Sequence, residues 1–337
     1  MNSDLITIAV DAMGGDDSPH KTLKGVEIFL KDHPGVEIVL FGNKTEIISS
    51  INTNNLNLVN LEIVDCLDNV SNEDTANIII RNRSDSSISR GLNFIKDRKF
   101  SGFVSAGNTA AIMILSRLKL GMIYGIDRPA ICSVIPNQDN FSIMLDLGAN
   151  VSVNAKNLLQ FALMGYCFHS ILKPTSDPKI GIVNIGTEDN KGYEFLQEAS
   201  NLISDSFLKQ YYYGFIEPTK ITSNICDIMI CDGYTGNIIL KTAEGMSHFI
   251  TNNLKYVFQK NFFNKLAYKF LENDLKNFKD EINPDKYNGA ILMGVNGVSI
   301  KSHGSATPFA FACAIDRCYD FITNNINEKI SNEFNKL

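Results

Sequence analysis

The sequence lacks the features of several protein classes. It contains no run of lysine and arginine, and its 31 basic and 37 acidic side chains give a net charge of −6. Because neutralisation of phosphates supplies most of the affinity for nucleic acids, this charge argues against a nucleic-acid partner. No apolar run approaches the roughly 20 residues that cross a bilayer, and the start MNSDLITIAVDAMGG has neither a basic segment nor a cleavage site. We therefore expect a cytosolic protein.

Metal and cofactor motifs are also missing. The seven cysteines form no C-x-x-C pair, and no histidine completes a zinc-ligand spacing near them. We expect reduced, mostly buried thiols and no bound metal. The chain also lacks the patterns G-x-G-x-x-G, G-x-x-x-x-G-K-[ST], G-x-S-x-G and H-E-x-x-H. The usual dinucleotide, nucleoside triphosphate, serine-hydrolase and zincin sites therefore lose their main support, and we expect no cofactor.

What the sequence does contain is a regular alternation of short β-branched runs and longer amphipathic segments. The predicted strands cover 5–11, 36–41, 61–65, 101–105, 141–147, 179–185 and 227–232. Several are continuously apolar, which is typical of a sheet buried on both faces, and the alternation predicts parallel strands with right-handed crossovers. The length allows two modest domains or one large one. Since no linker interrupts the pattern, we predict a single α/β domain over 1–337.

Capping residues mark two helix starts. Asn154 opens the segment 154–172, whose apolar residues recur at the i, i+3, i+4, i+7 spacing of one buried helix face. Thr307 followed by Pro308 marks a second helix start. After residue 320 the chain is polar and rich in asparagine, so we expect 321–337 to be a frayed tail.

One stretch breaks the alternation of strands and helices. Residues 246–282 contain no strand pattern and predict two amphipathic helices with a joint near Asn261, which together would form an inserted helical hairpin. The phenylalanines are Phe249, Phe258, Phe262, Phe263, Phe270 and Phe278, and lysines lie between them. This composition fits a helix pair that lies on anionic lipid, and it equally fits a dimer or core face with a solvated edge. Both interpretations stay open.

Glycine and small polar residues follow the predicted strands repeatedly. The loops are 11–16, 105–109, 146–150, 184–192 and 231–237, with a sixth group at 294–297 and 301–305. Ligands of open parallel sheets bind beyond the carboxyl ends of the strands. A single such loop most often serves an ordinary turn, but six together predict a polar rim around one cleft.

Two of these loops place glycine before a predicted helix start, at 107–109 and at 236–237. Free N–H groups and the positive end of the helix dipole bind phosphate or an oxyanion at such a start. The candidate cations are Lys191, Lys301 and His303, with Ser305 close to the histidine. Lysine is usually solvated and a histidine in a turn often only hydrogen-bonds there, so each has an ordinary alternative. From the residues alone we predict an α/β enzyme with a cleft that favours phosphate.

The order of the motifs resembles the phosphate acyltransferase family of bacterial phospholipid synthesis. The similar segments, between about residues 5 and 320, are IAVDAMGGD, SDSS (84–87), VSAGNTAA, GIDRPAI, LDLGANV, NIGTEDNKG, CDGYTGNIILKTAEG and GVNGVSIKSHGSA. The chain departs from the usual family residues with Asp74 in place of Pro, Arg83 in place of Lys, Ala110 and Asn288 in place of Gly, and Thr187 in place of Glu.

The resemblance implies a fold, a reaction and partners. It implies a three-layer α/β/α sandwich, similar to isopropylmalate dehydrogenases and phosphotransacetylases, with a protruding helical hairpin. It also implies transfer of a fatty acyl group from acyl carrier protein to inorganic phosphate, with the acyl phosphate used by a membrane glycerol phosphate acyltransferase. A homodimer is usual, and some members attach peripherally to the inner face of the cell membrane.

The same hypothesis assigns residues to roles. The predicted catalytic residues are Lys191, His303, Asn108 and Asn237. The predicted phosphate-binding residues are Gly107, Asn108, Thr109, Lys191, Gly236, Asn237, Lys301, Gly304 and Ser305. Contacts to the acyl group or its carrier are assigned to Asp11, Gly14, Gly15, Arg81, Arg83, Asp146, Asn150 and Asp232. A basic surface patch for the acidic carrier would be drawn from Arg81, Arg83, Arg90, Lys96 and Arg98.

The energetics of the reaction limit what the protein must supply. The leaving thiol has a pKa of about 8.5, and phosphate is already anionic at neutral pH, so a covalent nucleophile is unnecessary. We expect direct attack of a phosphate oxygen on the thioester, with oxyanion support from His303 or Lys301. A metal-dependent hydroxyacid dehydrogenase of the same fold and a non-catalytic scaffold that binds the carrier or a membrane are the alternatives.

Overall fold

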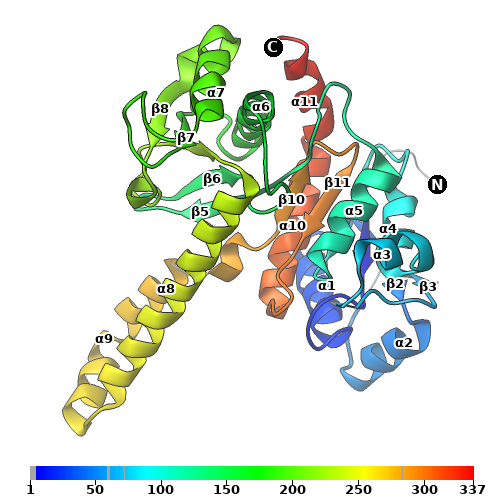
Figure 1. The fold of residues 1–337 in the computed structure, drawn as a ribbon. Helices are drawn as coiled ribbons and strands as arrows, with labels where there is room; N and C mark the ends of the chain where they lie inside the picture. The colour runs from blue at the N-terminus through cyan, green and yellow to red at the C-terminus, as the bar shows by residue number, and fades with distance from the viewer. Residues whose placement is uncertain (1–4, 59–60, 72, 282–283) are drawn as a thin grey trace.

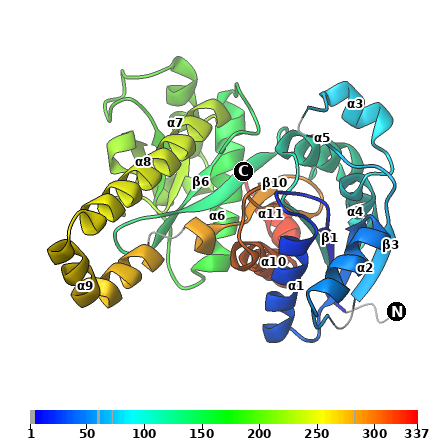
Figure 2. The ribbon, with the colours of Figure 1, turned by 90° about the horizontal axis from the view of Figure 1, so that it is seen from below.

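The protein is built on one sheet of 11 strands between two layers of helices (Figures 1 and 2). The computed structural model describes residues 5–58, 61–71, 73–281 and 284–337. The sheet order is β3-β2-β1-β4-β11-β10-β5-β6-β9-β7-β8. The strands are β1 (Thr7–Asp11), β2 (Glu37–Gly42), β3 (Leu61–Asp65), β4 (Ser101–Ser105), β5 (Ala130–Pro136), β6 (Phe141–Leu145), β7 (Ile180–Val183), β8 (Tyr212–Ile216), β9 (Ile228–Ile230), β10 (Ala290–Met293) and β11 (Val298–Lys301).

The helices cover both faces of the sheet, which confirms the three-layer α/β/α sandwich. The α-helices are α1 (His20–Asp32), α2 (Lys44–Thr53), α3 (Ala76–Asn82), α4 (Ser87–Ile95), α5 (Thr109–Leu120), α6 (Ala155–Leu172), α7 (Glu194–Asp205), α8 (Gly233–Gln259), α9 (Phe262–Glu281), α10 (Pro308–Thr323) and α11 (Ile326–Phe334). The short 3-10 helices are η1 (Phe207–Tyr211), η2 (Pro218–Lys220) and η3 (Pro284–Tyr287). Helices α1, α6, α7, α10 and α11 pack into one core cluster, and α3, α4 and α5 into the other.

The continuously apolar strands are buried on both faces, as their composition predicts. In β1, Ile8 and Val10 face the core under α1 and α10, while Ala9 faces the core under α4. In β6, Ile143 and Met144 divide between the two cores in the same way. Because successive side chains of a strand point to opposite faces, an unbroken apolar run supplies both cores at once.

The prediction of parallel strands is confirmed within two groups of strands, but the sheet as a whole is mixed. Strands β3, β2, β1, β4 and β11 are parallel to one another, and so are β6, β9, β7 and β8. Between these two groups, β10 pairs antiparallel with both β11 and β5, and β5 pairs antiparallel with β6. Three reversals in a row leave the two groups running in opposite directions. Their carboxyl ends therefore do not share one edge of the sheet.

The two predicted helix caps are confirmed. Asn154 and Asn157 cap the start of α6 reciprocally, because the side chain of each accepts a hydrogen bond from the backbone N–H of the other. The Thr307 hydroxyl accepts from the N–H of Ala310 at 3.1 Å, and Pro308 is the first residue of α10. These side chains bind backbone groups that a helix start leaves free.

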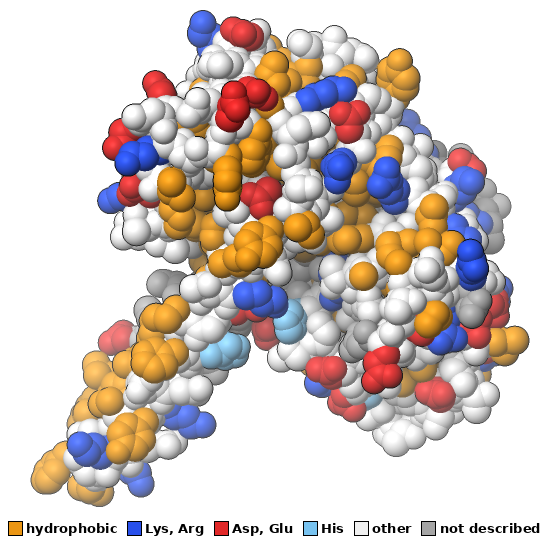
Figure 3. Space-filling view, in the orientation of Figure 1, with side chains coloured by type: hydrophobic (Ala, Val, Ile, Leu, Met, Phe, Trp, Pro, Cys, Tyr) orange, Lys and Arg blue, Asp and Glu red, His pale blue; other side chains and the backbone are white. Residues whose placement is uncertain are grey.

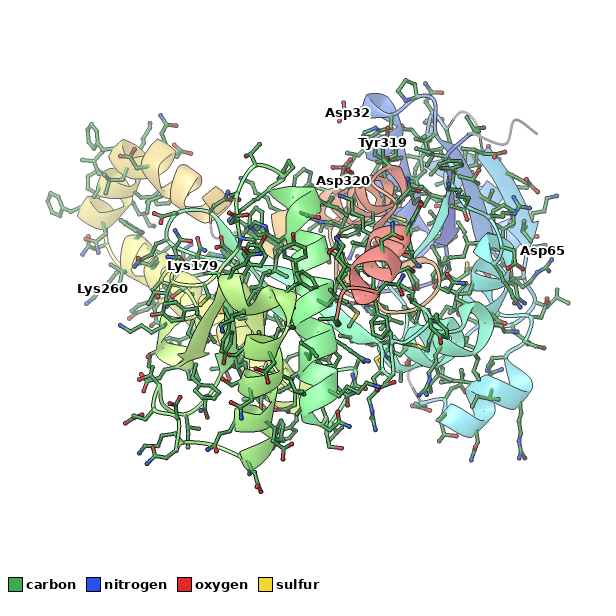
Figure 4. All side chains as sticks on the ribbon, turned by 90° about the horizontal axis from the view of Figure 1, so that it is seen from above. Asp32, Asp65, Lys179, Lys260, Tyr319 and Asp320 are labelled. Carbon is green, nitrogen blue, oxygen red and sulfur yellow. The ribbon has the colours of Figure 1, made fainter. Side chains whose placement is uncertain are left out.

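The last helices lie against the rest of the molecule. In Figure 4, the labelled Asp32 at the end of α1 lies beside Tyr319 and Asp320 of α10. The centres of the His33 and Tyr319 rings are 4.5 Å apart. The expectation of a frayed tail over 321–337 is wrong. Residues 326–334 form α11, which packs on α6, and its Ile326 and Ile330 are buried. These isoleucines and the partly buried Phe334 recur at a spacing of four residues, so they anchor this polar helix by one face.

The helical hairpin projects from the body as α8 and α9 (Figure 1). Its turn lies at Asn261, as predicted, but α8 begins at Gly233 and so includes a part that packs against the body near β6. Figure 3 shows hydrophobic side chains along the projecting part. Phe262, Phe263 and Phe270 are 74%, 78% and 82% exposed. Residue 282 and the side chain of Phe278 lie outside the described part. No helix of the described chain is long and apolar enough to cross a membrane.

Candidate active site

A cleft of about 560 Å³ opens beyond the carboxyl ends of β1, β4 and β11. It is lined by Met13, Gly14, Gly15, Asp16, Asn69, Val70, Ser71, Ala106, Gly107, Asn108, Thr109, Ala110, Lys241, Lys301, His303 and Gly304. Figure 3 shows a hollow between the base of the hairpin and the other half of the molecule, with basic and histidine side chains at its edge. Three of the glycine-rich loops singled out from the sequence therefore meet at one site.

Asp11 holds two of these loops together from beneath. Its carboxylate accepts the Ser105 hydroxyl at 2.6 Å and the N–H of Met13 at 3.1 Å. A Cβ at Gly14 would lie 2.5 Å from both the Asp11 carboxylate and the N–H nitrogen of Gly107. Burial raises the pKa of Asp11, which these hydrogen bonds oppose. Asp11 thus shapes the floor of the cleft, whereas the sequence analysis assigned it to acyl or carrier contacts.

The start of α5 forms a second wall. The Asn108 side chain caps the helix, because its Oδ1 accepts the N–H of Ala111 at 3.0 Å. Its Nδ2 donates to the carbonyl of Ser71 at 3.3 Å. The side chain of Asn108 is therefore engaged in positioning the loops. What α5 offers to a ligand is its first turn, with Thr109 and Ala110 on the wall and the positive end of the helix dipole behind them.

The loop after β11 supplies positive charge. Lys301 is half-buried, and its ammonium group donates to the carbonyl of Ser302. Burial is the main cause that lowers the pKa of Lys301 to about 8, while the Asp11 carboxylate raises it and Lys241 lowers it further. A lysine in this range carries its charge at neutral pH and loses it in mildly alkaline solution.

The hydrogen bonds of His303 determine its tautomer. Its Nδ1 lies 3.2 Å from the backbone N–H nitrogen of Ser305 and 2.8 Å from the Ser305 hydroxyl. Because a backbone N–H can only donate, Nδ1 is an acceptor, and the proton of the neutral ring is on Nε2. The side chain of Asn288 supports this loop, accepting the N–H of His303 at 2.9 Å and donating to the Ser302 hydroxyl at 2.7 Å.

Comparison with known proteins shows the family of the chain. The model of the family described as "Fatty acid synthesis protein" matches residues 6–329. A phosphate acyltransferase of Clostridium tetani is 38% identical over 96% of this chain and 98% of its own length, and one of Anaplasma phagocytophilum is 36% identical over 100% and 99%. The chain belongs to the phosphate acyltransferase family. It is a transferase.

Solved structures show the same fold. A phosphotransacetylase from Streptococcus pyogenes aligns with a TM-score of 0.63 at 15% identity, covering 95% of both chains. A branched-chain phosphotransacylase from Enterococcus faecalis aligns with a TM-score of 0.60 at 12% identity, covering 94% of this chain and 99% of its own. At this low sequence identity, the similarity to these two structures shows the fold alone.

A second group of the predicted residues lies at the start of α8. The buried carboxylate of Asp146 accepts backbone N–H groups of the loop that follows it, including that of Asn150 at 2.8 Å, and burial raises its pKa. Asp232 caps α8 by accepting the N–H of Thr235 at 2.9 Å. A Cβ at Gly236 would collide with the Asp146 carbonyl. These residues position the helix, whereas the sequence analysis assigned Asp146, Asn150 and Asp232 to acyl or carrier contacts.

The start of α8 also differs from the expected arrangement at Gly236 and Asn237. Both lie inside the first turns of the helix, which begins at Gly233. Neither is among the residues that line the cleft, and a Cβ at Gly148 would contact the Asn237 side chain at 3.6 Å. The residue of α8 that reaches the cleft is Lys241, which the sequence analysis did not single out. Its position in the CDGYTGNIILKTAEG motif, four residues after Asn237 and so on the same helix face, was the available signal.

Lys191 is not brought to the cleft. It is exposed in the loop after β7, where the Asn184 side chain donates to its carbonyl at 3.0 Å. Thr187 and Asp189 of the same loop line a separate hollow of about 430 Å³ beside β8. The loop follows a strand of the reversed half of the sheet, which is why it does not join those after β1, β4 and β11. The segment 294–297 is likewise elsewhere, at the turn between antiparallel β10 and β11.

The predicted basic patch is partly occupied by internal contacts. Arg83 forms a bidentate ion pair with Asp74 at 2.9 and 3.0 Å, so two of the positions expected to depart from the family pattern pair with each other. Arg90 is 3.3 Å from Asp85, and the guanidinium of Arg98 lies 3.8 Å from the centre of the Phe94 ring. The other two members, Arg81 and Lys96, are exposed.

The cysteines are free, and all except the half-buried Cys313 are buried. Burial raises the pKa of Cys66 to about 11 and that of Cys226 to about 12, so these thiols stay protonated and unreactive at neutral pH. Among the described residues, no group of three or more His, Cys, Asp and Glu side chains is arranged to hold a metal ion.

Proposed function

We propose that this chain transfers a fatty acyl group from the thioester of acyl carrier protein to inorganic phosphate, forming acyl phosphate. The observation on which the proposal rests is the cleft itself. It combines the first turn of α5 with Lys301 and His303, in a member of the phosphate acyltransferase family. Phosphate is the acceptor that this set of donors suits, because ammonium groups and a helix N-terminus both favour an anion.

The reaction proceeds by direct attack. A phosphate oxygen forms a bond to the thioester carbon, the carbonyl oxygen becomes an oxyanion, and the carbon–sulfur bond then breaks to release the carrier thiolate. The phosphate is already ionised and the thiolate is a good leaving group, so no covalent enzyme intermediate is needed. The protein supplies positioning and donors for the developing charge.

His303 acts as a donor in this scheme. Because Nδ1 accepts from Ser305, the remaining ring proton on Nε2 is available to the oxyanion or to phosphate. In this tautomer Nδ1 is already occupied, so the ring does not serve as a general base through that nitrogen. Lys301 adds a full charge from the same loop while it stays protonated.

The carrier approaches over the strap formed by residues 69–71, which closes one side of the cleft. Arg81, an exposed member of the basic patch on the helix that follows this strap, offers a contact to its acidic surface, whereas Lys96 lies at the opposite edge of the sheet, beside the first residue of β4. Such contacts are screened by salt, so we expect the KM for the acyl carrier thioester to rise with ionic strength. A KM independent of salt would exclude this docking mode.

The exposed hairpin supports an assembly of two copies. Phe262, Phe263 and Phe270 leave an apolar surface in water that a second copy of the same hairpin would cover. Sedimentation or light scattering at working concentration tests this, with Phe263→Glu expected to give a monomer. A wild-type chain that is monomeric would refute the assembly, and binding to anionic vesicles in its place would favour the lipid interpretation.

The direct test of the function combines purified protein, acyl carrier thioester and inorganic phosphate. We expect acyl phosphate to appear by mass detection together with free carrier thiol, and to depend on phosphate. Folded protein that releases thiol without forming acyl phosphate, or forms neither, would refute the proposal.

A further inference from the structure

The cleft contains a second lysine that comes from the opposite half of the sheet. Lys241 lies on α8, which follows β9 of the reversed strand group, whereas Lys301 is the last residue of β11 in the other group. Both line the same cleft. Apart from Lys241, the lining residues come from the loops and helix starts of the β1 side of the molecule. Lys241 is thus the contact through which α8 takes part in the site.

The Lys241 side chain is held in an ion pair. Its Nζ lies 2.8 Å from Oε2 of Glu244, one turn further along α8. The Lys241 side chain is 57% exposed and that of Glu244 is 33% exposed. An exposed i, i+3 pair of this kind is weak, so another anion in reach of the lysine competes with the carboxylate.

The charges around the cleft favour such a competitor. The Lys241 ammonium group is close enough to Lys301 to lower the pKa of Lys301, and the buried Asp11 carboxylate opposes that effect. An anion placed between the two ammonium groups would interact favourably with both. Phosphate at neutral pH carries the charge of one to two carboxylates and several acceptor oxygens, which matches two ammonium groups better than a single carboxylate does.

We propose that Lys241 binds the acceptor phosphate from the α8 side of the cleft and that Glu244 competes with phosphate for Lys241. This rests on the proposed function and adds a phosphate-binding residue to it. Phosphate then connects the two halves of the molecule, with Lys301 on one side and Lys241 on the other. The ion pair with Glu244 is the resting state of Lys241, and phosphate replaces it.

Two substitutions in opposite directions test the proposal. We expect Lys241→Met to raise the KM for phosphate roughly tenfold or more, because a charged hydrogen bond is lost, and to change the KM for the acyl carrier thioester less than about twofold. We expect Glu244→Gln to lower the KM for phosphate about two- to fivefold, because the competing carboxylate is removed. If Lys241 had only a structural role, Glu244→Gln would not increase the affinity for phosphate. Lys255→Met, an exposed lysine further along the same helix, is the control and should behave as wild type.

Calorimetric titration with inorganic phosphate, without acyl donor, separates this inference from the function. Weaker phosphate binding in Lys241→Met supports the site even if no acyl transfer is found. Unchanged phosphate binding and KM in folded Lys241→Met overturn it, even if acyl transfer is confirmed. Should Lys241→Met fail to fold, Glu244→Gln decides alone: tighter phosphate binding supports the proposal and unchanged or weaker binding overturns it.

Discussion

We expect the protonation of Lys301 to set an alkaline limit on the proposed activity. Burial lowers the pKa of Lys301 to about 8, and the groups that face it act in opposite directions: the Asp11 carboxylate raises the pKa and the Lys241 ammonium lowers it. His303 lies on the same loop. With a pKa near 8, about nine tenths of Lys301 is charged at pH 7 and about one tenth at pH 9. We therefore expect kcat/KM for phosphate to fall above pH 8, approaching tenfold per pH unit.

Two variants test whether Lys301 causes this fall, the alkaline limb of the pH profile. Lys301→Arg keeps its charge throughout the range, so its activity should show no decline between pH 8 and pH 9.5. Lys241→Met removes a positive charge that lowers the pKa of Lys301, so its limb should move to higher pH.

The assay measures acyl phosphate at subsaturating phosphate in buffers of constant ionic strength, with enzyme-free samples to correct for alkaline hydrolysis of the thioester. Circular dichroism at each pH confirms that the protein stays folded. An alkaline limb that is unchanged in folded, active Lys301→Arg would refute the reasoning.

His303, the ion pair of Arg83 with Asp74 and the buried His169 can each be tested by substitution. His303→Gln keeps an N–H donor near the Nε2 position and should retain measurable turnover, whereas His303→Ala should lose more; a loss of roughly 10²–10⁴-fold in both would indicate a general base. Arg83→Ala removes the bidentate partner of Asp74, which itself accepts the N–H of Ser71 on the cleft wall. Amide exchange around Ser71 should become faster and the KM for the acyl donor should rise about three- to tenfold; unchanged exchange would show that the strap does not need the ion pair. Burial lowers the pKa of His169, which the Asp227 carboxylate, 3.9 Å from its Nε2, only partly opposes, and within the described part of the chain this Nε2 makes no hydrogen bond. The unfolded chain therefore binds the proton first, and stability should fall as the pH drops below about 6.5. In denaturant titrations between pH 8 and pH 5, the free energy of unfolding should fall less for His169→Phe than for the wild type. An equal fall in the two proteins would refute the assignment to His169.

Local patterns in the sequence determined the elements that depend on neighbouring residues. The caps at Asn154 and Thr307 and the turn at Asn261 follow from side chains that bind backbone groups a few residues away. The doubly buried strands follow from apolar runs. The same local reasoning missed β5, β8, β10 and β11, and it missed the buried face of α11, where Ile326, Ile330 and Phe334 are widely spaced apolar residues in a polar segment.

The arrangement of the site depended on strand pairing, which local patterns do not encode. The three reversals at β10 and β5 turn one half of the sheet around. They separate Lys191 from the cleft and leave Lys241, four residues beyond Asn237, as the residue of α8 that enters it. The tautomer of His303 likewise required the position of the Ser305 N–H. Residue types and their order along the chain determined the family, the anion-favouring loops and several of the helices. Which of those loops meet was decided by the tertiary structure, because hydrogen bonds between strands far apart in the chain set their direction and neighbours.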